Sequence, residues 1–225
     1  LIWWPADDPA PQPARAIDAH AGWIRGVAVS PDGQLVASVG NDRIVRIWSL
    51  AEGTLQRELS GHESHIYSVL FDSDGKSLLS GDLKGVVRQW DVASGTERRK
   101  FDAGVLWKYD EGFRADIGGV RGMMLSGDRT LLACAGITGV TNAFAGVGQP
   151  VAAVFDYAGG TAKIVHKVNE TINAVLWNVA FHPEGYLIGA AGGGAGGFLV
   201  FWHPAEEAEF FRLKLGANCR DMALH

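Results

Sequence analysis

The sequence predicts an all-β protein built from repeated four-stranded antiparallel units. His20 precedes Trp48 by 28 residues (48 − 20), and His62 precedes Trp90 by the same 28 residues (90 − 62). The two pairs are offset by 42 residues (62 − 20). A period of about 40 to 45 residues, with a His near its start and a Trp near its end, is typical of a β-propeller in which each repeat forms one blade.

Strand and turn signals divide each repeat into four short strands. Alternating apolar residues in the segments VAVS, LVAS and VRIW indicate half-buried strands. Short segments ending in Gly, at 31–33, 51–53, 73–75 and 93–95, indicate the turns between them. Four strands within one period leave little room for a helix, which favours a series of antiparallel blades.

Two further repeats follow in a degraded form. In the third, residues 126–134 align with residues 30–38, and Phe155 stands where the earlier repeats have Trp. In the fourth, residues 181–185 align with residues 29–33, and Trp202 closes the repeat. The four whole repeats are expected at residues 19–60, 61–101, 102–168 and 169–215. The third is longer than the others and therefore contains insertions.

Both ends of the sequence align with parts of a repeat. Residues 1–4 align with residues 46–49, so we assign residues 1–18 to the end of a preceding repeat. Residues 216–225 resemble the start of a following one. We therefore expect a single partial propeller domain over residues 1–225, with four whole repeats and partial repeats at both ends, and we expect it to be a fragment of a longer parent.

Four side chains of the first repeat have a defined spacing: Asp42 follows Ser38 by four residues and precedes Trp48 by six, with His20 upstream. This set resembles the structural tetrad of the WD40-repeat family. The resemblance covers the whole chain and implies a hydrogen-bonded series from Trp through Ser and His to Asp, in which each buried donor finds an acceptor. A His–Ser–Asp set also occurs in hydrolases, but its recurrence favours scaffolding because an active site is single.

The other repeats depart from this pattern. The second keeps His62, Ser80 and Trp90 but has Lys84 at the Asp position and Asp82 two residues earlier, so we expect its tetrad to be incomplete. Apolar residues occupy tetrad positions in the third and fourth repeats, namely Cys134, Phe155, Ile172 and Ala190. We expect packing to hold those blades together. The segments DIGGVRG and TNAFAGVG also resemble a group of bacterial WD40-repeat proteins, which implies an architecture and no reaction.

Every long insertion falls in loops expected on one face of the propeller. The insertions are residues 102–119 and 136–150 of the third repeat and the glycine run 192–197 of the fourth. Aromatic and Arg side chains provide large contact areas and dominate interface hot spots. We therefore predict a protein or peptide site formed by Trp107, Tyr109, Phe113, Arg114 and Phe144. The alternative is that these aromatics fold inward beneath their own loops.

Motifs for other chemistry are missing from the sequence. The glycine run precedes a strand and not a helix, which argues against a phosphate-binding loop and favours a close backbone approach to the neighbouring insertion. There is no HExxH, GxSxG, CxxC or EF-hand pattern. We expect no catalysis, cofactor or metal. A ligand- or metal-binding sensor, or an enzyme with its site at the central channel, remains the alternative, because spacing does not test residues drawn from several blades.

Composition limits the class of partner. The formal net charge of −5 argues against nucleic-acid binding, and the run Arg98-Arg99-Lys100 is too short to supply a basic surface. No run of 18 apolar residues could cross a membrane. Cys134 and Cys219 lie in apolar, strand-like segments and are expected to be buried thiols. A protein or peptide partner and a cytoplasmic location are favoured.

Overall fold

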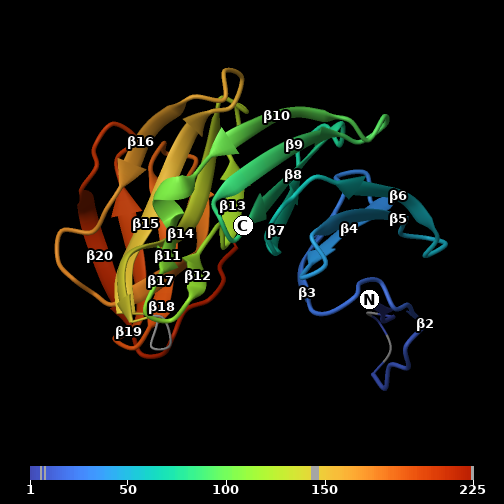
Figure 1. Cartoon of the computed structure of the whole chain (residues 1–225), viewed down its shortest axis with the longest axis horizontal. Coiled ribbons are helices and arrows are strands. Elements are labelled where there is room, and N and C mark those ends of the chain that lie inside the picture. Colours follow the sequence, from blue (N-terminus) through green and yellow to red (C-terminus); the bar gives the residue numbers. More distant parts are fainter. Residues whose placement is uncertain (6, 8, 143–146, 224–225) are drawn as a thin grey trace.

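A computed structural model of the chain describes residues 1–5, 7, 9–142 and 147–223. Within these residues, four antiparallel sheets each contain four strands, and the strand order in every sheet follows the chain. The predicted all-β fold of four-stranded antiparallel blades is confirmed. Figure 1 shows the blades side by side in a curved row, with the first blade at one end and the fourth at the other.

Each blade is one sheet of consecutive strands. The first contains β3 (Ile24–Val29), β4 (Leu35–Gly40), β5 (Ile44–Ser49) and β6 (Leu55–Ser60). The second contains β7 (Ile66–Phe71), β8 (Ser77–Asp82), β9 (Val86–Asp91) and β10 (Glu97–Asp102). The third contains β13 (Gly122–Leu125), β14 (Leu131–Asn142), β15 (Val147–Asp156) and β16 (Ala162–His166). The fourth contains β17 (Ala174–Phe181), β18 (Leu187–Gly193), β19 (Gly196–Trp202) and β20 (Glu209–Leu215).

Burial across a blade follows from its place between neighbours. The second strands of the first two blades, β4 and β8, are almost wholly buried, because strands flank them on both sides and neighbouring residues cover both of their faces. The outermost strands β6 and β10 are mostly exposed, and each buries a single apolar side chain, Leu59 or Phe101. Alternation along the strand places that one residue against the neighbouring strands and sends the charged residues to water.

Apolar faces hold the blades against one another. Val39, Val45 and Ile47 of the first blade form one buried cluster with Ile66 and Leu78 of the second. The third and fourth blades meet through a cluster that contains the following residues: Ala133, Ala135, Ala152, Leu176, Val200 and Trp202. Small residues on one blade accept the large rings of the other, which gives close packing without a polar network. The first strands β3, β7, β13 and β17 are successive neighbours along the inner side of the row.

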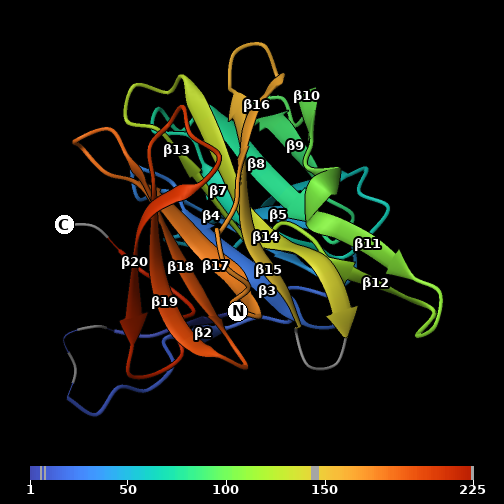
Figure 2. The ribbon, with the colours of Figure 1, turned by 90° about the vertical axis from the view of Figure 1, so that its left-hand side faces the viewer.

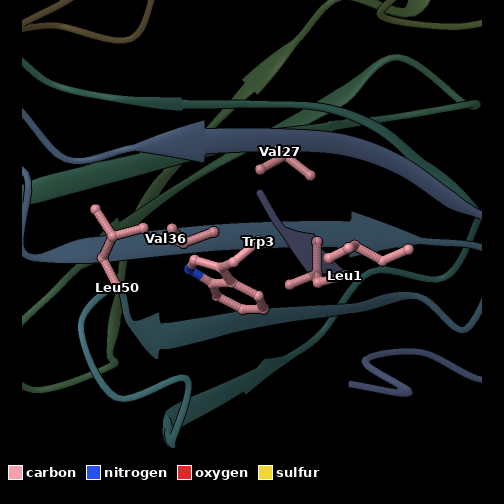
Figure 3. Close-up of a pocket in the computed structure, with 6 residues that line it drawn as sticks. Leu1, Trp3, Val27, Val36 and Leu50 are labelled. Carbon is pink, nitrogen blue, oxygen red and sulfur yellow. The ribbon is translucent and has the colours of Figure 1, made fainter. Parts of the chain in front are cut away.

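Two smaller strand pairs accompany the blades. A 3₁₀ turn (Gly104–Leu106) leads into the hairpin β11 (Trp107–Asp110) and β12 (Ala115–Gly118), between the second and third blades. The pair β1 (Ile2–Trp3) and β2 (Arg15–Ala16) lies against the first blade. Leu1 and Ile17 pack there against Val36 and Trp48. An apolar cavity of about 150 Å³ lies between this pair and the blade, and Figure 3 shows Trp3 and Leu1 beside Val27 and Val36.

The glycine run lies at the turn that joins β18 and β19. The prediction that this run lies close to the insertion of the third blade is wrong for Gly192 and Gly197. A Cβ atom on Gly192 would collide with the backbone of Cys219, and one on Gly197 would collide with the backbone of Ala217. The C-terminal segment therefore crosses this hairpin, and two positions without side chains allow the close contact.

Candidate functional site

The tetrad side chains of the first blade form one hydrogen-bonded chain. Trp48 Nε1 donates to Ser38 Oγ at 2.9 Å, and that hydroxyl lies 2.8 Å from His20 Nε2. His20 Nδ1 lies 2.8 Å from Asp42 Oδ1. Burial by itself raises the pKa of Asp42, but hydrogen bonds from Arg46 and His20 outweigh it and hold that pKa at about 2. The carboxylate thus stays ionised and fixes the imidazole.

The second blade has a complete tetrad, so the expectation of an incomplete one is wrong. His62 Nδ1 lies 2.7 Å from Asp82 Oδ2, and His62 Nε2 lies 2.7 Å from Ser80 Oγ. Trp90 Nε1 donates to the same hydroxyl at 2.8 Å. Asp82 ends β8, and its Oδ1 accepts the backbone N–H of Val86 across the turn, which directs the carboxylate toward His62. The side chain of Lys84 is exposed, and only the backbone N–H of this residue takes part, donating to Asp82 Oδ1 at 2.9 Å.

Both networks are enclosed. Ser38 and Ser80 have no exposed surface, and each hydroxyl is shared between an indole N–H and an imidazole nitrogen. A nucleophilic Ser needs an open approach for its substrate, which these hydroxyls lack. The tetrads therefore tie the loop that precedes a blade to the second and third strands of that blade, which is a structural role.

The hairpin formed by β11 and β12 holds most of the residues predicted to bind a partner, and Figure 2 shows it projecting beyond the blades. Trp107 is 36% exposed, Tyr109 is 48% exposed and Phe113 is 45% exposed. Arg114, beside the turn, is also exposed. Phe144 lies outside the described residues. The hairpin thus brings together two strand aromatics and, at its tip, a third aromatic with an arginine.

The opposite face of the hairpin is anchored to the third blade. Lys108 Nζ donates to the carbonyl oxygen of Val140 at 3.1 Å, and Ile117 packs against Val140 and Ile137. On the outer face, Trp107 Nε1 donates to Asp116 Oδ1 at 2.9 Å. This bond joins the two strands of the hairpin and fixes the indole ring on the surface.

Sequence reasoning missed a second group on the inner strands. One residue from each blade and one from the C-terminal segment occupy equivalent positions, and we call this set the channel ring: Arg25, Tyr67, Arg121, Trp177 and Arg220. The signal that reveals it is the alignment of WIRGV, HIYSV, GVRGM and VLWNV, at the start of the inner strands, with NCRDM in the C-terminal segment. The pattern is hard to detect from the sequence because the aligned residue alternates between Arg and an aromatic residue and is never the same in consecutive repeats.

Among the described residues, neither a group of metal ligands nor a membrane-spanning helix is found. No three of their His, Cys, Asp or Glu side chains gather in a way that could hold a metal ion. Nor does the described chain form a helix with the length and hydrophobicity that a membrane crossing demands. Cys134 is buried, and burial raises the pKa of its thiol; Cys219 is half-buried, and both are free thiols.

A row of four-stranded antiparallel blades, two of them tied by buried Trp–Ser–His–Asp networks, defines a repeat protein of the β-propeller class. Residues 11–49 and 53–91 match the family described as WD40, the WD domain or G-beta repeat. These matches are two WD40 repeats: the first covers β2 to β5 and the second covers β6 to β9, so together they include most of the first and second blades. The third and fourth keep the blade topology without the polar network of the family.

Relatives and solved structures agree with this assignment. The chain is 44% identical over 45 residues to the pre-mRNA-splicing factor prp46 of Emericella nidulans, a match covering 20% of this chain and 10% of that protein. It is 51% identical over 37 residues to the small ribosomal subunit protein RACK1z of Oryza sativa subsp. japonica, covering 16% of this chain and 11% of that one. The matches thus span about a tenth of these relatives.

Among solved structures, the computationally designed Ika4 protein superposes with a TM-score of 0.58 at 18% identity. The superposition covers 84% of this chain and 95% of the designed one. At that identity the likeness shows the fold alone.

Proposed function

We propose that the protein is a non-catalytic interaction platform that binds a protein or peptide through the β11–β12 hairpin. The observation that carries the proposal is the outer face of this hairpin, where Trp107 and Tyr109 are exposed. The opposite face is held against the third blade by the hydrogen bond from Lys108 to Val140. Large rings held rigidly at a surface contribute contact area at low entropic cost, which is the property of interface hot spots.

Strand geometry explains why the two rings act together. Trp107 and Tyr109 stand two residues apart on β11, so they point to the same face, and Lys108 between them points to the blade. Asp116 lies opposite Tyr109 on β12 and adds a carboxylate to the patch. The surface therefore offers two rings and one hydrogen-bond acceptor, a combination that suits a peptide with apolar and donor groups.

The relatives support the general role and not the hairpin itself. Their names describe a splicing factor and a small ribosomal subunit protein, which are parts of larger assemblies. The family match covers residues 11–49 and 53–91, whereas the hairpin follows them in an insertion. We infer that the blades supply the scaffold and that the hairpin supplies the particular specificity.

Peptide selection tests this proposal. A phage-displayed peptide library is selected against the intact chain, and the affinities of the selected peptides are then measured for a Trp107→Ala/Tyr109→Ala variant. We expect the variant to bind at least about tenfold more weakly, because hot-spot truncations cost on the order of 2 kcal/mol or more. The melting temperature should change by a few degrees at most, since both side chains are surface residues.

Phe211→Ala provides the matched control. Phe211 is 51% exposed on β20 of the fourth blade, far along the row from the hairpin. Its substitution should leave peptide affinity unchanged. Equal loss of affinity in both variants, or selected peptides that bind the double variant as well as the original, would contradict the proposal.

A further inference from the structure

The five positions of the channel ring are equivalent in the sequence, and the four that lie in blades are equivalent in the backbone as well. Arg25, Tyr67 and Trp177 each occupy the irregular position where the pairing of their strand with the next strand shifts by one residue. A bulged residue is left out of the ladder and its side chain is re-aimed. Arg121 stands just before β13 at the same point of its blade, and its backbone N–H bonds to Ala135.

The ring side chains stack on one another in chain order. The guanidinium carbon of Arg25 lies 4.9 Å from the ring centre of Tyr67. The guanidinium carbon of Arg121 lies 4.2 Å from the ring centre of Tyr67 and 5.7 Å from that of Trp177. Arg220 lies 5.7 Å from the ring of Trp177. Arginine and aromatic residues thus alternate, each arginine face lying within cation–π range of a ring.

Close approach of the inner strands makes this stacking possible. A Cβ atom on Gly122 would lie 2.6 Å from the carbonyl oxygen of Trp177, so the residue after Arg121 has no room for a side chain. The residue after Arg25 is Gly26, where a Cβ atom would lie 3.3 Å from the carbonyl oxygen of Tyr67. Glycine at both places lets adjacent strands bring their bulged side chains within stacking distance.

Stacking occupies the faces of the guanidinium groups and leaves part of their N–H edges available: Nε of Arg25 donates to Asn41 Oδ1 at 2.9 Å, and Arg121 shares a side-chain hydrogen bond with Tyr67. In the described part of the chain, ion pairs involve other arginines: Arg46, Arg88, Arg98, Arg129 and Arg212. Nε of Arg121 is buried without a hydrogen-bond partner. Burial also lowers the pKa of Arg121 from its ordinary value. The Arg121 guanidinium group is therefore partly removed from water, and no carboxylate forms an ion pair with it to offset that cost.

The arginines border an open cavity of about 390 Å³ on the inner side of the blades. Its lining contains three arginines and a single carboxylate, Asp221, which gives a formal charge of +2 (3 − 1). One oxygen of this carboxylate, Asp221 Oδ1, accepts hydrogen bonds from Asn178 Nδ2 and from the backbone N–H of Met222. A positive cavity within a chain of net charge −5 focuses attraction on a small anionic group.

We propose that the channel ring is an oxyanion-binding site that holds a carboxylate or phosphate group between Arg25, Arg121 and Arg220. Planar guanidinium groups stacked on aromatic rings present their N–H donors in a fixed direction, which suits bidentate recognition of such groups. The site lies on the inner strands and is independent of the partner proposed for the hairpin.

Titration calorimetry of the intact chain tests the proposal at constant ionic strength, with three oxyanion probes. Inorganic phosphate, a phosphoserine peptide and a glutamate peptide represent the free and peptide-borne forms, and a glutamine peptide is the neutral control. We expect oxyanion binding to become at least about tenfold weaker in Arg121→Gln and in Arg220→Gln. Arg121→Lys should restore it only in part, because an ammonium group keeps the charge but loses the planar fork.

Two further variants separate this site from general charge effects and from the hairpin. Lys163→Gln removes a positive charge from an exposed position of β16 and should leave binding unchanged. Trp107→Ala/Tyr109→Ala should also keep it, whatever becomes of peptide capture. Arg220 is exposed, so its variant folds even if the Arg121 variant does not. Binding of phosphate alone assigns the anion to a small molecule, and tighter peptide binding assigns it to a protein ligand. Absence of binding by all three probes, or equal binding by Arg220→Gln, would overturn the proposal.

Discussion

His62 and Asp82 are joined by a 2.7 Å hydrogen bond within the second blade, although Asp82 stands two residues before the position that the first blade uses. The Asp82 carboxylate bonds to Nδ1 of His62 from the end of β8. In the first blade, the Asp42 carboxylate bonds to Nδ1 of His20 from a turn. Side-chain direction can therefore restore a network that spacing indicates to be broken. The contact also makes the neighbouring lysine a natural control.

Replacing Asp82 by Ala should destabilise the protein, whereas replacing Lys84 by Ala should not. The first change leaves His62 and the backbone N–H of Val86 without their acceptor in a buried setting, at a cost of about 3 kcal/mol in the free energy of unfolding. The second removes an exposed side chain and should cost less than about 0.5 kcal/mol. Urea denaturation of both variants provides the measurement, and equal losses would show that Asp82 does not serve the tetrad.

Two tryptophans should respond differently to replacement by Phe. Trp48→Phe removes the N–H that donates to Ser38 and should lower the free energy of unfolding by about 1 kcal/mol. Trp3→Phe removes an indole N–H that is buried without a partner, so the loss should be smaller or even a gain. Thermal denaturation compares the two variants. A larger loss for Trp3→Phe would contradict this assignment of the hydrogen bonds.

Acid should weaken the first tetrad over a defined range of pH. The pKa of Asp42 is about 2 in the folded protein and 3.8 ordinarily, so the unfolded chain binds more protons between these values. The contribution to stability is complete above about pH 4 and is lost as the pH falls toward 2. Comparing melting temperatures of the original protein and Asp42→Asn across pH 2 to 6 checks this. Their difference should shrink toward low pH, and a constant difference would refute it.

The sequence by itself determined the repeating part of the protein. The period, the turns and the alternation of apolar residues are local properties, so they specify the four-stranded blades wherever the chain lies in space. The same spacing selected Ser38, Asp42 and Trp48, because Ser38 and Trp48 lie on the adjacent strands β4 and β5 and Asp42 lies in the turn between them. It also marked residues 102–119 as an insertion rich in aromatic residues, whereas the exposure of those residues was decided by the structure.

Only the tertiary structure decided which blades are in contact and which groups of residues these contacts bring together. Arg121 contacts Tyr67 and Trp177 because three blades converge, and no local pattern states which inner strands are neighbours. Gly192 approaches Cys219 and not the insertion of the third blade for the same reason. Contacts within one repeat follow from periodicity, whereas contacts between repeats depend on rigid-body packing, and the channel ring exists only once that packing has occurred.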